Sequence, residues 1–150
     1  NIPVGERVKS FFVVSVTLKR KDFNPNTIAT VTKLIPQNML LVLEYGDEAK
    51  LAVYRQKLLQ TDWMPKKNLT IELKGLDLDK AWENIIVQVG GIQIADGNTL
   101  DEQISADEKR AKLEKEIARL EKLARAEKQP KKKFELVQKM KNLKIDLEDK

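Results

Sequence analysis

Apolar residues over the first part of the chain alternate between strand-like and helix-like spacing. The segment Val8 to Leu18 contains the run Phe11 to Val14, which is apolar at every position and predicts a strand inside a sheet that is covered on both sides. A second continuous apolar run, Met39 to Tyr45, predicts another strand. Between them Asn24-Pro25 starts a short helix that Pro36 ends, and its apolar positions recur on one face: Ile28, Val31, Leu34 and Ile35. Strand, helix and strand together predict a right-handed crossover unit.

Residues 46–95 continue this mixed pattern. Gly46-Asp47 predicts a turn into a strand over 51–59, which pairs with the preceding strand as an antiparallel hairpin. Alternation over 69–74 predicts another strand, and 92–95 predicts an edge strand. Residues 77–89 have helical spacing, with Asp77 or Asp79 as the cap and Gly90-Gly91 as the end; the apolar stripe is Leu78, Ala81, Trp82, Ile85 and Val89. Residues 1–96 are therefore predicted to form an α/β domain, with a mixed sheet flanked by helices.

Residues 100–150 have mirror symmetry about Pro130. The apolar positions before this proline are Leu113, Ile117, Leu120 and Ala124, and those at the same separations after it are Leu136, Met140, Leu143 and Leu147. Each set steps by about three and four residues, which is the seam spacing of packed helices. Pro130 suits the first turn of a second helix because that position needs no amide proton. The pattern predicts a C-terminal antiparallel coiled-coil helical hairpin, joined to the α/β domain by residues 96–99.

Composition narrows the possible functions mainly by exclusion. The chain of 150 residues contains no cysteine and no histidine, which excludes zinc-finger ligation, thiolate chemistry and histidine general bases within this chain. We expect no resident cofactor. The sequence contains no apolar run of about eighteen residues and no signal-type leader, so we expect a cytoplasmic protein that does not enter a membrane.

The excess positive charge of the chain lies on the predicted hairpin. Residues 107–150 carry 15 Lys/Arg and 10 Asp/Glu, whereas residues 1–106 carry 13 of each. The densest group lies near the turn: Arg125, Lys128, Lys131, Lys132 and Lys133. A projecting basic tip can contact phosphates, so DNA is a possible partner. Lysine and glutamate also simply solubilise exposed helices. Phe134 is expected to pack in the seam, which leaves no aromatic side chain to stack on bases and argues against a dedicated single-strand binder.

One enzymatic alternative follows from the predicted order of elements. A helix, three strands, a second helix and a last strand resemble the core of the PD-(D/E)xK nuclease superfamily. Glu72 and Lys74 on the predicted strand 69–74 match its E-x-K element, and the second carboxylate would come from Asp47 or Glu48. In such a site the carboxylates hold Mg²⁺ and the lysine positions water. The competing interpretation is an outward-facing Glu and Lys that alternate with buried Ile71 and Leu73.

Two tryptophans and one acidic group are further candidates for functional residues. Trp82 lies on the apolar stripe of its helix and is predicted to be core. Trp63 lies in a polar loop before Met64-Pro65, which makes it the better candidate for a recognition residue. The carboxylates Asp77, Asp79 and Glu83 gather at a helix start, where they favour the dipole and cap free amides, so we interpret them as structural.

Several stretches together resemble the bacterial family named domain of unknown function 4391. The resemblance covers about residues 6–148 and rests on 45–52, on 61–65, on 73–79 with Trp82-Glu83-Asn84 and Gln88, and on the hairpin from Leu113 to Leu143. It implies an accessory protein encoded beside DNA methyltransferases and helicases of restriction or phage-defence type. It also implies an additional amino-terminal segment that this chain lacks.

The hypothesis from sequence is a non-catalytic interaction or adaptor protein. Its basic arm would dock on a protein partner or on DNA, within a DNA-modification or phage-defence assembly. The hairpin also makes a homodimer possible. The alternative is a Mg²⁺-dependent nuclease that uses Asp47, Glu72 and Lys74.

Overall fold

The computed structural model describes residues 2–148, and it divides the chain into two compact units, 1–101 and 102–150. Residue 1 and residues 149–150, at the outer ends of the two predicted segments, lie outside the described residues. The two units are considered in turn.

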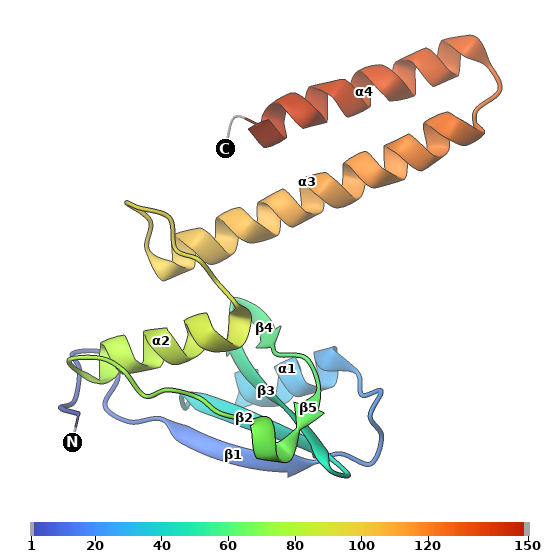
Figure 1. Cartoon of the computed structure of the whole chain (residues 1–150). Helices are drawn as coiled ribbons and strands as arrows, with labels where there is room; N and C mark the ends of the chain where they lie inside the picture. Colours follow the sequence, from blue (N-terminus) through green and yellow to red (C-terminus); the bar gives the residue numbers. More distant parts are fainter. Residues whose placement is uncertain (1, 149–150) are drawn as a thin grey trace. The chain divides into compact units, whose positions relative to one another are not determined.

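The first unit is a mixed five-stranded sheet with helices. Its elements are β1 (Phe12–Thr17), α1 (Pro25–Leu34), β2 (Met39–Tyr45), β3 (Glu48–Arg55), β4 (Lys57–Gln60), β5 (Met64–Pro65), a 3₁₀ turn (Lys66–Asn68) and α2 (Leu78–Gly90) (Figure 1). The strand order is β1-β2-β3-β4, and β5 also pairs with β3. β1 and β2 are parallel, whereas every other pair is antiparallel. The predicted fold class is confirmed.

Each face of the sheet carries its own apolar layer because side chains alternate along a strand. On one face a buried cluster receives Phe23 and Ile28 from the region of α1, and its members are Met39, Leu41, Leu43 and Ala52. The other face holds Leu40, Val53 and Leu59, which the strand register places side by side. Helix α2 contacts β3 and β4, and its buried residues are Ala81, Trp82, Ile85, Ile86 and Val89.

The helix ends follow from their capping residues. The side chain of Asn24 accepts a hydrogen bond from the Asn26 amide at the start of α1, as the Asn24-Pro25 pair predicted. At the start of α2, Asp77 is the cap and accepts from the Lys80 amide at 2.9 Å, which settles the choice left open between Asp77 and Asp79. Gly91 ends α2 in the left-handed conformation at φ 60°.

Two predictions of burial in the first unit are wrong, one on the sheet and one on helix α1. β1 is an edge strand and not an interior one, and Phe12, Val13 and Val14 are 48%, 61% and 36% exposed. On α1 the predicted apolar stripe is largely exposed, including Leu34 at 77%. The helix instead directs Ile28 toward the cluster and buries Thr32, whose hydroxyl donates to the Ala29 carbonyl at 2.8 Å.

Three predicted strands also differ. The strand predicted over 51–59 is broken at Gln56, whose φ of 64° reverses the chain between β3 and β4. Residues 69–74 do not form a strand, because α2 side chains occupy their backbone groups: Gln88 bonds both the amide and the carbonyl of Glu72, and Asn84 donates to the Lys74 carbonyl. Residues 92–95 are likewise irregular.

The second unit is formed by α3 (Leu100–Ala126), apart from its first two residues, and by α4 (Pro130–Glu148). The helices run antiparallel beside each other and join at a short turn (Figure 1). On α3, Ile117, Leu120 and Ala124 are buried, and the mirror positions on α4 are half-buried: Leu136, Met140, Leu143 and Leu147. The predicted helical hairpin and the start of its second helix at Pro130 are confirmed, while coiled-coil packing in the strict sense stays a prediction.

Candidate functional site

The turn of the hairpin carries the strongest concentration of one charge. Lys128, Lys131, Lys132 and Lys133 are all exposed, and no carboxylate occurs between Glu127 and Glu135. Among the described residues no ion pair is recorded for these four lysines. The Glu127 carboxylate accepts from the Gln129 amide at 3.0 Å, so it helps to shape the turn. The tip therefore presents four ammonium groups to solvent.

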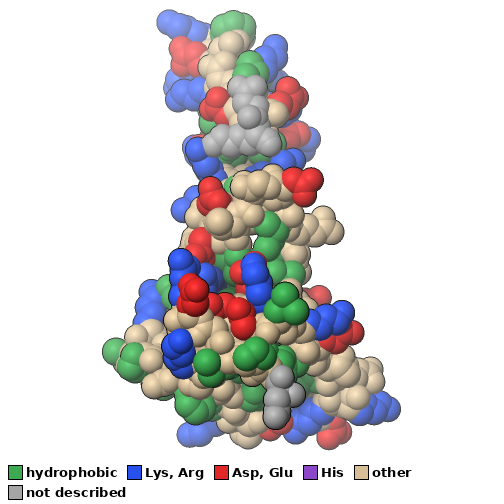
Figure 2. Space-filling model, turned by 90° about the vertical axis from the view of Figure 1, so that its left-hand side faces the viewer, with side chains coloured by type: hydrophobic (Ala, Val, Ile, Leu, Met, Phe, Trp, Pro, Cys, Tyr) green, Lys and Arg blue, Asp and Glu red, His purple; other side chains and the backbone are tan. Residues whose placement is uncertain are grey.

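Arg125, the fifth basic residue predicted for this site, behaves differently. Its guanidinium is paired with Glu121 one turn earlier on α3, at 2.5 Å. Similar pairs occur earlier in α3, between Arg110 and Glu114 and between Arg119 and Glu116. Figure 2 shows basic and acidic side chains interspersed over the hairpin. The body of the hairpin is thus a mixed-charge surface, and the four lysines of the turn differ from it.

Phe134 does not pack in the seam, contrary to the expectation. Its side chain is 68% exposed in the first turns of α4, directly after the three consecutive lysines. On a helix, positions three and four residues apart share a face, which groups Phe134 with Val137 and leaves Leu136 and Met140 for the seam. An exposed aromatic ring beside lysines is a surface on which an unpaired base can stack. The argument against contact with single strands is therefore removed.

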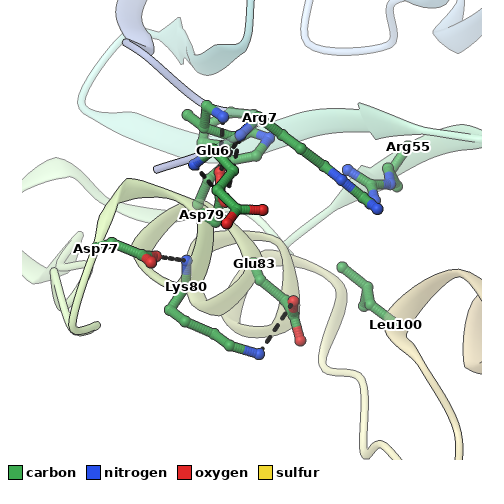
Figure 3. A pocket seen from close by; sticks show the side chains of 10 residues that line it. Glu6, Arg7, Arg55, Asp77, Asp79, Lys80, Glu83 and Leu100 are labelled. Atoms are coloured by element: carbon green, nitrogen blue, oxygen red, sulfur yellow. Dashed lines mark hydrogen bonds and ion pairs between the residues drawn. The ribbon is translucent and has the colours of Figure 1, made fainter. Parts of the chain in front are cut away.

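A second polar site lies at the start of α2, in a hollow of about 390 Å³. The carboxylate of Asp79 accepts hydrogen bonds from the backbone amides of Glu6, Arg7 and Val8, with Oδ2 to Glu6 N at 2.9 Å and Oδ1 to Val8 N at 2.6 Å (Figure 3). Gly5 permits this loop, since a Cβ there would lie 2.2 Å from Asp79 Oδ1. These amides, with Val8 first, hold the pKa of Asp79 below its ordinary value.

The remaining charges of this hollow are largely paired with one another. Arg55 binds Asp101 through Nε at 2.7 Å and Nη2 at 3.0 Å, and this hydrogen bonding holds the Asp101 pKa below its ordinary value. Lys80 lies 4.0 Å from Glu83. Arg7 extends toward Arg55 in Figure 3, and both guanidinium groups act on Asp101. The hydrogen bonds of Asp79 hold the amino-terminal loop against the start of α2, and the residues that line the hollow offer no arrangement of a nucleophile with a base.

Replacement of Asp79 by asparagine is expected to destabilise the first unit. The neutral amide is a weaker acceptor for three backbone donors, and its amino group faces them unfavourably. Because the folded-state pKa of Asp79 is lowered, its contribution is present above the ordinary carboxyl pKa of about 4 and is lost as the pH falls through the lowered value. Urea unfolding followed by tryptophan fluorescence should show a gap between wild type and Asp79→Asn at neutral pH that closes in acid.

Asp77→Asn is the matched control for this prediction. The same chemical change two residues earlier leaves a side chain that caps the helix equally well, so its effect on unfolding should be small. Equal losses in the two variants would show that the amides of residues 6–8 contribute no stability through Asp79.

Trp63, predicted as a recognition residue, is half-buried and already engaged within the chain. The ammonium groups of Lys21 and Lys50 lie 5.5 Å and 5.2 Å from its ring centre. Lys50 also lies over Phe23 and donates to Gln60, and burial, opposed by Asp62, lowers the pKa of its amine. The ring therefore supports the packing of two lysines, and its recognition role stays a prediction.

The residues of the nuclease alternative lie on separate parts of the first unit. Asp47 and Glu48 lie at the turn from β2 to β3, where Glu48 pairs with Lys21 at 2.8 Å. Glu72 and Lys74 lie on the irregular segment beside α2 and pair with each other. No group of three or more potential acidic, cysteine or histidine ligands gathers among residues 2–148. The strand that would have carried the E-x-K element is not formed, while the reaction itself stays open to a cleavage assay.

The part of the chain that the structure describes has no helix with the length and apolar character needed to cross a membrane.

The structure defines the general class of this protein. It has an α/β unit in which β1 and β2 are parallel, followed along the chain by a helical hairpin with a basic turn. A family model described as Domain of unknown function (DUF4391) matches residues 2–147, and the chain belongs to this family. The predicted resemblance is therefore confirmed. No curated protein and no solved structure matches the chain significantly.

Proposed function

We propose that the protein is a non-catalytic adaptor that binds nucleic acid through the turn of its helical hairpin. The observation that carries this proposal is the group of four exposed lysines, Lys128 and Lys131 to Lys133, which form no ion pair within the described part of the chain. Each phosphate that such a lysine neutralises releases counterions, which favours binding at low salt. The exposed Phe134 beside them adds a stacking surface for an unpaired base.

The adaptor role extends this binding to a larger assembly. In the resemblance described above, family members accompany DNA methyltransferases and helicases, so the finer proposal is a subunit of a DNA-modification or phage-defence complex in the cytoplasm. An adaptor needs a second contact, with a protein partner, besides its contact with DNA. The hairpin is suited to the DNA contact because its turn projects beyond the seam that holds the two helices together.

Reversal of the three consecutive lysines tests the proposal. The triple variant Lys131→Glu, Lys132→Glu and Lys133→Glu is expected to weaken binding to a fluorescein-labelled DNA oligonucleotide by at least about tenfold at about 50 mM salt. Its slope of log affinity against log salt concentration should be less steep by about 2–3. Fluorescence anisotropy with single-stranded and duplex forms, between about 50 and 200 mM salt, measures both quantities.

The matched control is the triple variant Lys139→Glu, Lys141→Glu and Lys144→Glu. It makes the same change in net charge on the same helix, away from the turn, and should retain most of the affinity. Equal losses in the two variants would show that overall charge, and not the tip, governs binding. Undiminished binding by the tip variant would overturn the proposal. Addition of Mg²⁺, with Lys74→Ala as comparison, tests the nuclease alternative on the same samples: cleavage that depends on Lys74 would support it.

A further inference from the structure

The outer edge of β1 is open along its whole length. β1 is the end strand of the order β1-β2-β3-β4, and among the described residues only β2 pairs with it. Toward β2, the Phe12 amide donates to the carbonyl of Asn38, the residue before β2, and the Leu18 amide donates to the carbonyl of Glu44, each at 2.8 Å. In a parallel pair, alternate residues direct their backbone groups to the same neighbour, so Val13, Ser15 and Thr17 direct theirs outward. Such a row of groups is a template for another strand.

The side chains of this edge offer no protection against pairing. Val13 is 61% exposed on one face of the sheet, and Phe12 and Val14 are 48% and 36% exposed on the other. Proteins commonly protect an open edge with a charged residue or proline, and β1 contains neither. β1 is therefore mostly apolar, and its outer edge is unpaired. Both properties are found in edges that accept an added strand.

The surroundings of β1 extend this surface and give it a charge. A hollow of about 380 Å³ lies at its amino-terminal end, with Arg7, Lys9 and Ile35 among its lining residues. Beyond the other end follow Lys19 and Arg20, both exposed. No carboxylate occurs between Glu6 and Asp22. The uncharged strand is thus flanked by exposed cations at both ends.

This charge distribution distinguishes between two possible occupants. In an antiparallel pair of two copies of β1, outward-directed residues must lie opposite outward-directed residues, so the twofold axis passes through a residue. An axis at Val14 would place Lys9 opposite Lys19 twice. Like charges directly opposite each other destabilise a strand pair. An extended segment from another protein, with carboxylates at its ends, would instead meet a cation at either end. The flanking charges therefore favour a different, acidic partner over a second copy.

We infer that the β1 edge is a docking site for an extended segment of a partner protein, with alternating apolar residues at its centre and acidic residues at both ends. The added strand exchanges backbone hydrogen bonds with Val13, Ser15 and Thr17. Its side chains lie beside Val13 on one face and beside Phe12 and Val14 on the other. This site is separate from the lysines proposed to bind nucleic acid, and the inference does not depend on them.

Ser15→Pro and Ser15→Ala are the variants that test this site. Proline removes an outward amide and places its ring on the edge, but it leaves the amides that donate to β2 unchanged. Alanine at the same exposed position keeps the amide. Urea unfolding followed by tryptophan fluorescence establishes that both variants retain the fold of the first unit.

A phage-displayed library of random peptides, selected on the immobilised wild-type chain, supplies the probe. We expect enriched peptides with an apolar centre and acidic ends. Synthetic copies should bind wild type and Ser15→Ala equally in fluorescence anisotropy and Ser15→Pro at least about tenfold more weakly. Failure to enrich any peptide, enrichment without acidic ends, or equal binding to Ser15→Pro would each overturn the inference.

Light scattering on wild type, Ser15→Ala and Ser15→Pro tests the remaining possible occupant, which is a second copy of the chain. A monomer in every case agrees with a docking site for another protein. A wild-type dimer that Ser15→Pro dissociates would assign the edge to a second copy and would overturn the choice of partner.

Discussion

Replacement of Leu43 by alanine is expected to lower the free energy of unfolding of the first unit by about 2–5 kcal/mol. Leu43 is 0% exposed and lies in β2 within the cluster of Met39, Leu41 and Ala52. The loss includes the transfer free energy of the deleted carbons and a cavity that the surrounding strands cannot fully close. Both tryptophans, Trp63 and Trp82, belong to this unit, so their fluorescence in a urea titration follows its unfolding.

Leu34→Ala is the matched control, with the same deletion on the surface. The Leu34 side chain is 77% exposed at the end of α1, so its truncation should change the free energy of unfolding by no more than about 0.5 kcal/mol. The comparison of Leu43→Ala with Leu34→Ala is informative because helical spacing predicted that Leu34 would be buried. A large loss for Leu34→Ala would show that the α1 surface is covered in the folded protein.

The sequence predicts the elements of this protein best where a local signal decides the structure. Asn24 and Asp77 cap α1 and α2 because their side chains bond amides two or three residues away. Pro130 begins α4 for a similarly local reason. The continuous apolar run of β2 also predicts its bounds, because a central strand covered on both sides has few polar positions.

Errors arise where the environment is set by distant parts of the chain. An apolar run such as Phe12 to Val14 has the same pattern in a central strand and at an unprotected edge, and only the strand order distinguishes the two. Alternation over 69–74 predicts a strand, but the side chains of Asn84 and Gln88 bind its backbone first. Phe134 follows the helical stripe only approximately, and the seam is already filled by its neighbours on α4.

The candidate sites divide in the same way. The lysines of the hairpin turn are consecutive or nearly so, and a charge count finds them without a structure. The binding of Asp79 by the amides of residues 6–8 joins positions more than seventy residues apart, and backbone donors have no side-chain pattern. The glycine at position 5 is a weak signal of this close approach, because glycine also occurs in many ordinary turns.

The tip and the β1 edge together give the adaptor proposal a physical basis. Charge would govern the proposed contact of the tip with nucleic acid, so this contact should weaken strongly with salt. Backbone pairing and apolar burial would govern much of the proposed contact at the β1 edge, so salt should affect that contact mainly through the flanking cations. Salt titration of each contact, with its own variant, therefore separates them experimentally.

Replacement of Gly75 by alanine is expected to lower the free energy of unfolding by about 2–4 kcal/mol, the second large effect. A Cβ at this position would lie 2.5 Å from the Ala81 nitrogen and 2.8 Å from the Lys80 carbonyl carbon. These atoms belong to the first turns of α2 and cannot move aside as a flexible side chain could. The expected loss combines overpacking of about 1–3 kcal/mol with about 1 kcal/mol of backbone strain at φ 153°.

Gly46→Ala separates these two causes. Gly46 has a φ of 59° at the turn between β2 and β3, and no atom lies within 4 Å of a Cβ built there. Alanine at this position should lower the free energy of unfolding only through strain of the left-handed backbone, by about 1–2 kcal/mol. A larger loss for Gly75→Ala in the same urea titration would confirm that the irregular segment lies against α2. Equal losses would mean that residues 71–76 can move away from the helix, and with them Glu72 and Lys74.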